Sequence, residues 1–291
     1  MTQLRTDLLR RLKTQIADLE GQLAADKTLP DTQLMENSIG RDQFCFGIES
    51  IDEAFTHNAM PLFCLNEIRA STREAGAGAG FLCALLAQLS TQRQGPLIWI
   101  ATHKTLCETG HLYGQGLHAL GLDPSRLLIV HTAKEKDALW AAEEALGLGE
   151  ALSVVLNLQT TAKGLSLPAT RRLHLRAEAN HTPCFMLLTG SDPPTPSIAL
   201  TRWQIEAANA GTLNGFEEGI GHPAFTANLT RNRQGQTGKF TVQWNNHHAK
   251  FETTDKRTSA APTHAGPTQE SGEAVSGAVV SLSRHRSTGA A

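Results

Sequence analysis

A glycine-rich segment lies between an apolar run and a helical pattern, where a phosphate-binding loop would be expected. The run Leu62–Ile68 leads into residues 69–80, which contain three glycines, and a helix is predicted to begin at Phe81. A strand, a small-residue loop and a helix N-terminus in this order form the setting in which backbone amides bind phosphate groups. The chemistry that this segment suggests is therefore nucleotide binding.

The side chains that complete such a loop are missing. A working phosphate loop has a lysine that reaches the β- and γ-phosphates and a hydroxyl residue that binds magnesium. Gly76 and Gly80 are present, but Ala77 or Gly78 stands where the lysine is expected and no serine or threonine follows. A lysine–phosphate contact is worth about 1.5–3 kcal/mol. Arg73 precedes the glycines, on the wrong side of the turn. We interpret the segment as a degenerate phosphate loop that binds no cofactor and packs a helix against the sheet.

Two further positions also lack the residue types that ATP hydrolysis requires. Neutral Asn157 stands in the run Ser153–Leu158, at the position where an ATP-hydrolysing enzyme keeps a magnesium-binding aspartate. After the run Leu97–Ala101, His103 is the nearest polar candidate where a glutamate would orient water. The three glycines also resemble a dinucleotide fingerprint. That motif needs an acidic residue at the end of the next strand, and residues 101–103 offer none. The sequence therefore predicts a protein that is not an enzyme.

Other residue types give little sign of catalysis or metal binding. The five cysteines are scattered singly and the twelve histidines show no ligand spacing, so we expect reduced, buried thiols and no metal. Trp99, Trp140, Trp203 and Trp244 lie at positions that suit core packing. The candidate interaction residues are Arg231, Arg233 and Lys239, in a stretch without acidic side chains. They would contact DNA phosphates or an acidic partner, or form a solvated strand face; both interpretations stay open.

Alternating strand and helix patterns predict the fold. Repeated strand–helix units favour a parallel sheet covered on both faces. After the prolines near residue 194, three runs joined by glycine-rich turns predict an antiparallel extension. We therefore predict an α/β fold with a mostly parallel central sheet flanked by helices and antiparallel strands at the C-terminal end. Parallel strands are expected at Leu62–Ile68, Leu97–Ala101, Leu127–His131, Ser153–Leu158 and Cys184–Leu188, helices at Phe81–Gln92, His111–Leu120, Lys134–Leu146 and Ala169–Asn180, and antiparallel strands at Leu200–Ala207, Phe225–Arg231 and Lys239–Trp244.

Composition divides the 291 residues into three parts. Residues 1–43 hold an amphipathic helix, predicted over residues 4–23, and a polar linker; residues 44–251 form the core; and residues 252–291, with few large apolar side chains, are expected to be disordered. The net charge of −2 gives no global attraction to nucleic acid. The chain has no apolar run long enough to span a bilayer and no secretory leader pattern, so we expect a cytoplasmic protein with no membrane contact.

Several segments, in this order, resemble the core of RecA ATPases. These are the entry motif at residues 46–52, the strand–helix pair that begins at residue 121, and the basic stretch at residues 229–233. More specifically, the chain is similar to the ImuA family of RecA-like proteins, which is related to SulA. The segments that carry this similarity are residues 65–68, 95–100, 138–146, 171–178, 201–203 and 231–244. The degenerate loop without a lysine also fits that family.

The resemblance implies a RecA-like core and a scaffold role in damage-induced (SOS) mutagenesis. The expected partners are an ImuB-like inactive Y-family polymerase and an error-prone C-family polymerase. Binding to RecA and direct contact with DNA are left open. Two alternatives remain: a SulA-like inhibitor of cell division, and a divergent ATP-binding protein related to recombinases.

Overall fold

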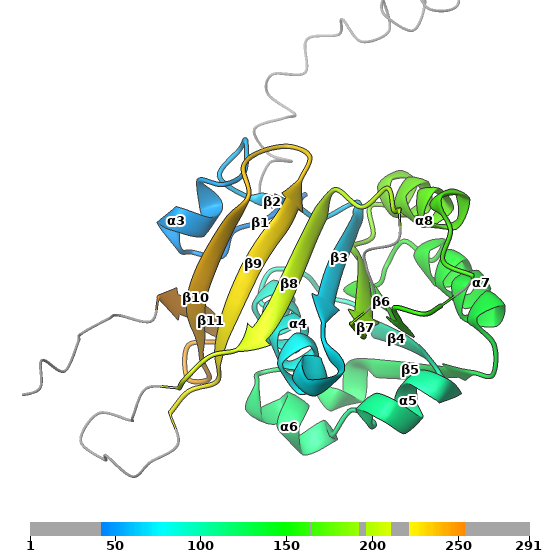
Figure 1. Ribbon diagram of the computed structural model, residues 1–291, viewed down its shortest axis with the longest axis horizontal. Coiled ribbons are helices and arrows are strands. Elements are labelled where there is room, and N and C mark those ends of the chain that lie inside the picture. The colour runs from blue at the N-terminus through cyan, green and yellow to red at the C-terminus, as the bar shows by residue number, and fades with distance from the viewer. Residues whose placement is uncertain (1–41, 163, 192–195, 211–220, 254–291) are drawn as a thin grey trace, which may run out of the picture. The chain divides into compact units, whose positions relative to one another are not determined.

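The computed structural model describes residues 42–162, 164–191, 196–210 and 221–253. All of these belong to one structural unit, which ends at Thr254 (Figure 1). The predicted helix over residues 4–23, most of the linker and all but the first two residues of the predicted tail lie outside the described residues.

A mixed sheet of nine strands forms the centre of this unit, with the order β11-β10-β9-β8-β3-β7-β6-β4-β5. Strands β3 to β8 are parallel, and β9, β10 and β11 continue the sheet in antiparallel pairing. A short pair, β1 with β2, lies outside it. The bounds are β1 Gln43–Phe44, β2 Met60–Pro61, β3 Leu65–Ala70, β4 Leu97–Thr102, β5 Leu127–Thr132, β6 Ser153–Gln159, β7 Cys184–Thr189, β8 Thr201–Ala207, β9 Ala224–Asn232, β10 Gly238–Asn245 and β11 Lys250–Thr253.

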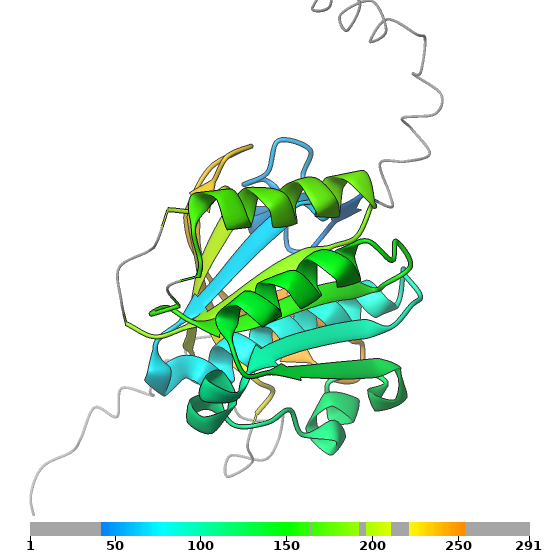
Figure 2. The ribbon, with the colours of Figure 1, turned by 90° about the vertical axis from the view of Figure 1, so that its right-hand side faces the viewer.

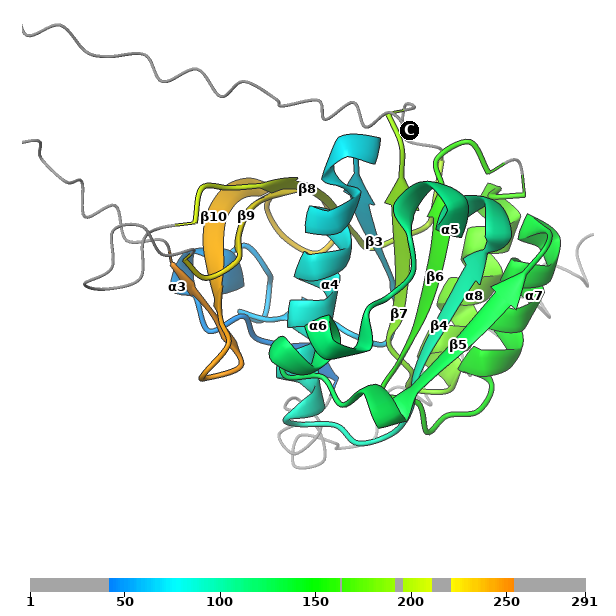
Figure 3. The same ribbon diagram turned by 90° about the horizontal axis from the view of Figure 1, so that it is seen from below.

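Helices cover the two faces of the sheet in separate groups (Figures 2 and 3). α7 and α8 pack side by side on one face, and α4, with α5 and α6, lies against the other. The helical bounds are α3 Glu49–Asp52, η1 Thr72–Glu74, α4 Ala75–Ser90, α5 His103–Thr109, α6 Gly114–Ala119, η2 Pro124–Arg126, α7 Glu135–Leu146 and α8 Leu167–Ala179.

The predicted α/β fold, with a large and mostly parallel sheet and a C-terminal antiparallel extension, is confirmed. The elements differ from the prediction in several places. α4 begins at Ala75 instead of Phe81, β3 begins at Leu65 instead of Leu62, and the helix expected over His111–Leu120 is the shorter α6. α5 and β11 had no sequence counterpart. Gly110, with a φ of 80°, ends α5, so α5 and α6 are separate helices.

Each face of the sheet has its own apolar core. The face under α4 contains Trp99, Trp203 and Trp244, all nearly fully buried, as predicted. Trp140 is the exception, because its side chain is 64% exposed on α7 while neighbouring Leu139 faces the sheet. The prediction that Trp140 packs in the core is therefore wrong.

β5 forms one edge of the sheet and pairs only with β4 among the described strands. Its first half is poorly covered, with Leu128 53% and Ile129 39% exposed. Two apolar side chains and one row of backbone hydrogen-bonding groups therefore face outward at this edge.

A buried ion network lies on the α8 side of the sheet, where β3 meets β8. Glu67 is 1% exposed and accepts hydrogen bonds from Arg69 Nη1 at 3.2 Å and from Arg202 Nε at 2.9 Å. Ser197 Oγ donates to the same carboxylate at 2.7 Å. Two guanidinium groups and one hydroxyl thus share a single buried carboxylate, and this network links β3 to β8, the last parallel strand before the antiparallel extension.

Candidate functional site

The segment that was expected to form a phosphate loop is mostly helical. β3 ends at Ala70, residues Thr72–Glu74 form the 3-10 turn η1, and α4 begins at Ala75. Gly76, Ala77, Gly78 and Gly80 are therefore residues of the first turns of α4, and the predicted loop over residues 69–80 is corrected to Ser71–Glu74. Alanine, the best helix former, alternates with glycine here. Because glycine has a low helix propensity, close packing against the sheet must stabilise the start of this helix.

Gly78 explains that packing. A Cβ atom added at Gly78 would lie 2.7 Å from the Cβ atom of Ala70, much closer than two methyl groups approach each other. At Gly76, in contrast, an added Cβ atom would meet nothing within 4 Å. Gly78 therefore allows α4 to rest directly on β3, which agrees with the interpretation that this segment packs a helix against the sheet.

The residue that precedes α4 is acidic. Glu74 Oε2 accepts a hydrogen bond from the backbone N–H of Ala207, at the end of β8, at 2.8 Å. Glu74 is the N-cap residue of α4, but its side chain makes no capping hydrogen bond to the helix; its negative charge is nevertheless near the positive end of the helix dipole. Arg73 is exposed beside it. A carboxylate thus lies near the start of α4.

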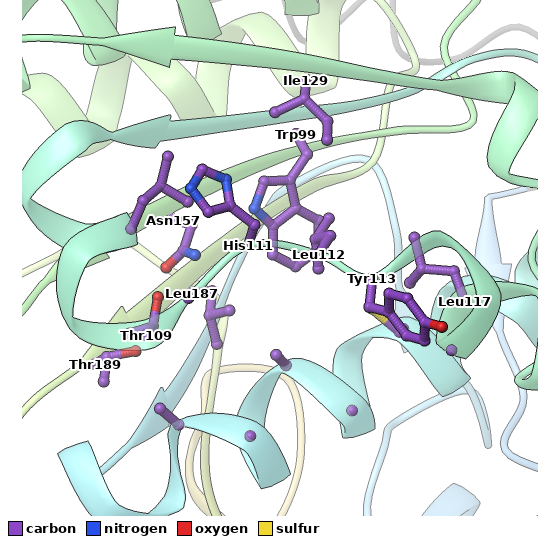
Figure 4. Close-up of a pocket in the computed structure, with 18 of the residues that line it drawn as sticks. Trp99, Thr109, His111, Leu112, Tyr113, Leu117, Ile129, Asn157, Leu187 and Thr189 are labelled. Carbon is purple, nitrogen blue, oxygen red and sulfur yellow. The ribbon is translucent and has the colours of Figure 1, made fainter. Parts of the chain in front are cut away.

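A cavity of about 270 Å³ lies between α4, the α5–α6 connection and the sheet (Figure 4). Its sheet wall is built from residues near the carboxyl ends of the parallel strands, where α/β proteins commonly bind ligands. The lining contains no Lys, Arg, Asp or Glu among the described residues. The lining residues are Ala75, Gly76, Ala79, Gly80, Cys83, Trp99, Leu106, Thr109, Gly110, His111, Leu112, Tyr113, Gly116, Leu117, Leu120, Ile129, His131, Asn157, Leu187 and Thr189.

Asn157 is a buried polar residue of this lining. It lies near the end of β6 and is 5% exposed. Its Oδ1 atom has no hydrogen-bond partner in the described part of the structure. Figure 4 shows its carboxamide at the end of the cavity where Thr109 and Thr189 also lie. The sequence singled out Asn157 as the neutral replacement of an acidic residue, and the structure places it beside the first turns of α4.

Two histidines lie together at the same cavity. The ring of His111, in the α5–α6 connection, lies 5.4 Å from the ring of His131 on β5, measured between centroids. Both side chains are exposed. Sequence reasoning missed this pair, because the two residues are 20 positions apart and the path of the α5–α6 connection beside β5 brings them together.

His103, the other polar candidate, does not line the cavity. β4 extends to Thr102, whose hydroxyl accepts a hydrogen bond from the backbone N–H of Thr105 at 3.2 Å. That contact caps α5, and His103 becomes the first residue of the helix, with an exposed side chain. A threonine that ends a strand and caps a helix was thus the signal that the prediction overlooked.

The three basic candidates occupy different surroundings. Arg231 Nη1 donates to the Ser197 carbonyl at 2.9 Å, next to the buried network, and burial lowers the pKa of this guanidinium. Arg233 is exposed in the β9–β10 turn, and Lys239 is exposed on β10 opposite Asn228. The structure thus gives Arg231 a packing contact and leaves the other two in solvent.

The thiols divide into two groups, and all five are free. Cys64, Cys83 and Cys184 are buried, whereas Cys45 and Cys107 are exposed. Burial raises the pKa of Cys64 and of Cys83 to about 12, so both stay protonated at neutral pH. The expectation of buried thiols therefore holds for three of the five.

The described residues hold neither a metal-binding cluster nor a membrane-spanning helix. No group of three His, Cys, Asp or Glu side chains in this part of the chain is placed to hold a metal ion. None of the helices that the structure describes has both the length and the apolar character needed to cross a bilayer.

These observations define an α/β protein with a large, mostly parallel sheet, consistent with a RecA-like fold, and with an uncharged cavity at the start of α4. No protein-family model matches the chain. The chain is similar to Protein ImuA of Caulobacter vibrioides, with 28% identity over 210 residues to the protein of strain NA1000 / CB15N. The aligned region covers 68% of this chain and 82% of that relative, and the protein of strain ATCC 19089 / CIP 103742 / CB 15 gives the same values.

Proposed function

We propose that this chain is a non-catalytic, ImuA-like accessory protein of damage-induced mutagenesis, which acts as a protein scaffold in error-prone translesion DNA synthesis. The similarity to Protein ImuA supports the assignment to damage-induced mutagenesis. The observation that supports the scaffold role is the uncharged lining of the cavity beside α4. In this proposal the chain works in the cytoplasm, without a nucleotide or metal cofactor.

Electrostatics at the start of α4 are the physical basis of the non-catalytic part. A triphosphate needs compensating cations, and magnesium needs oxygen ligands of which at least one is usually a carboxylate. The described lining supplies neither, since it contains Asn157 where an acidic ligand would be needed. Glu74 would in addition repel a phosphate at the helix N-terminus.

Isothermal titration with ATP and magnesium tests this part. We expect no heat of binding that corresponds to a micromolar dissociation constant, and no hydrolysis above the background rate. Micromolar binding would contradict the non-catalytic assignment and would favour an ATP-dependent switch.

The scaffold role requires partners, and we propose an ImuB-like inactive Y-family polymerase together with an error-prone C-family polymerase. A contact surface is available on the outward side of α7 and α8, where Trp140 is 64% and Leu175 is 50% exposed. An exposed tryptophan is the residue type that most often dominates binding at a protein interface. RecA is a further candidate partner.

A pull-down with the ImuB-like partner, using the full chain, tests this part of the proposal. We expect capture by the wild-type chain and at least about a tenfold loss of affinity for Trp140→Ala, corresponding to a hot-spot residue. Glu53→Ala, exposed at the end of α3 and far from α7 (Figure 1), is the control and should bind like wild type. Failure of the folded wild-type chain to capture the partner would contradict the proposed complex.

A further inference from the structure

We propose that the cavity between α4, the α5–α6 connection and the sheet binds a small uncharged heteroaromatic compound that carries an amide-like edge. Such an edge places a hydrogen-bond donor next to an acceptor, as in a lactam ring. The inference concerns a ligand site and does not depend on the proposed protein partners.

The buried carboxamide of Asn157 is the first reason. Polar atoms in protein interiors nearly always have hydrogen-bond partners, so a buried oxygen without one calls for an explanation. Asn157 Oδ1 has none in the described structure, although the residue is 5% exposed and lines the cavity. A carboxamide offers both donors and an acceptor, and its natural complement is another amide-like edge.

The walls of the cavity are the second reason. Trp99 lies against one side, Leu106 and Leu187 add aliphatic surface, and the paired rings of His111 and His131 lie on the same lining. Figure 4 shows the Trp99 and His111 rings near the Asn157 end of the cavity. Flat aromatic side chains favour ring-shaped ligands through offset or edge-to-face contacts.

Charge and size narrow the class of ligand further. The described lining has no fixed charge, so an anion or cation would lose its hydration without a compensating partner. The volume of about 270 Å³ is slightly below the range of about 300–1,000 Å³ that is typical of sites for drug-sized ligands. A bicyclic ring system of about ten non-hydrogen atoms therefore suits the cavity better than a nucleoside triphosphate.

Ligand-observed NMR on the full chain provides the test, with quinazolin-4(3H)-one as the uncharged bicyclic lactam. Naphthalene serves as the ring without an amide edge, and ATP with magnesium serves as the charged comparison. For wild type we expect the lactam to bind with a dissociation constant of roughly 0.1–1 mM, as expected of an efficient ligand of this size. We expect weaker binding of naphthalene and none of ATP.

Three variants locate the binding site. Asn157→Leu removes the carboxamide at similar volume and should weaken lactam binding at least about tenfold while leaving naphthalene unchanged. Ala79→Phe, on the cavity side of α4, should abolish binding of both ring compounds. Asn228→Leu makes the same substitution on the other face of the sheet and should change neither.

The proposal is wrong if the wild-type chain does not bind the lactam at millimolar concentration, or if Asn157→Leu binds it as well as wild type does. If the lactam fails and Ala79→Phe weakens capture of the polymerase-like partner, the cavity accepts a side chain of that partner, and the ligand assignment is overturned. If the lactam fails and ATP does not bind, only the ligand inference falls and the proposed function stands. If ATP displaces the lactam, both proposals are contradicted.

Discussion

Two buried polar side chains, Glu67 on one face of the sheet and Asn157 on the other, differ in charge and in hydrogen bonding. On the α8 face, Glu67 is buried together with two arginines, and each carboxylate oxygen has a hydrogen-bonded partner. On the α4 face, Asn157 is buried without charge, and its oxygen has no partner in the described structure. The charged groups thus stabilise the junction of the sheet, whereas the position where a nucleotide enzyme would need charge has none. This contrast suggests that the first group serves folding and the second a ligand.

The largest effect is expected at the ion network. Glu67→Gln keeps the volume but removes the charge that Arg69 and Arg202 share, and loss of one partner of a buried ion pair costs about 3–5 kcal/mol. Urea denaturation measures this loss in the free energy of unfolding. Glu206→Gln, exposed on the same face of β8, is the control and should stay within about 0.5 kcal/mol of wild type. A loss below about 1 kcal/mol for Glu67→Gln would show that the network contributes little to the free energy of unfolding.

A smaller effect is expected where α4 touches β3. Gly78→Ala would force a methyl group against Ala70 and should destabilise the protein by about 1–3 kcal/mol, the usual range for overpacking. Gly76→Ala, two residues earlier in the same helix, meets open space and should be neutral or stabilising by up to about 1 kcal/mol. Thermal unfolding of the two variants compares them directly. Equal changes would mean that helix propensity, and not contact with the sheet, determines the outcome.

Asn157→Leu should have the opposite sign to Glu67→Gln. Replacing a buried carboxamide whose oxygen has no partner by an apolar side chain of similar shape removes a desolvation cost, so we expect a gain of about 1 kcal/mol in the free energy of unfolding. The same urea experiment measures it. A loss of several kcal/mol would show that the Asn157 side chain is satisfied within the folded chain, and the contrast between the two faces would disappear.

The smallest effect concerns His174 of α8, which lies on the face of the ion network. Burial lowers its pKa below 6.5, and its Nδ1 atom accepts a hydrogen bond from the backbone N–H of Leu65 at 3.3 Å. Since the folded-state pKa is lowered, the folded state favours the neutral ring. The stabilisation is therefore present above the unfolded-state pKa and is lost as the pH falls through the folded-state value.

NMR titration of the histidine ring signals checks this assignment. We expect the His174 pKa to lie below 6.5, its value in the absence of burial. Unfolding measured at pH 7.5 and 5.5 should show a small loss of stability at the lower pH, and His174→Gln should reduce that loss. A His174 pKa above 6.5 would contradict the role of burial.

Sequence patterns predicted the central sheet better than its surroundings. The buried strands were found because their apolar runs are continuous, and β6 and β7 extend one residue beyond the predicted ends. The start of α4 was missed because glycines and alanines from residue 75 to 80 carry no helical periodicity, and helix formation there depends on the contact between Gly78 and Ala70. β11 is short, and no sequence signal set it apart from the polar stretch that follows.

The site was predictable only in part. Asn157 was found because its strand is recognisable and the expected residue type is known for that position. The cavity itself was not predicted, because it depends on how the α5–α6 connection places His111 and Tyr113 over the sheet. Loop conformation of this kind is determined by long-range packing, which local sequence patterns do not encode.

The open edge of β5 has a practical consequence for handling the protein. A strand with unpaired backbone groups and exposed Leu128 and Ile129 can accept another extended chain in register, including the same strand of a second molecule. We therefore expect the purified protein to self-associate as its concentration rises, and Leu128→Lys to improve its solubility without altering the cavity, because Leu128 does not line it.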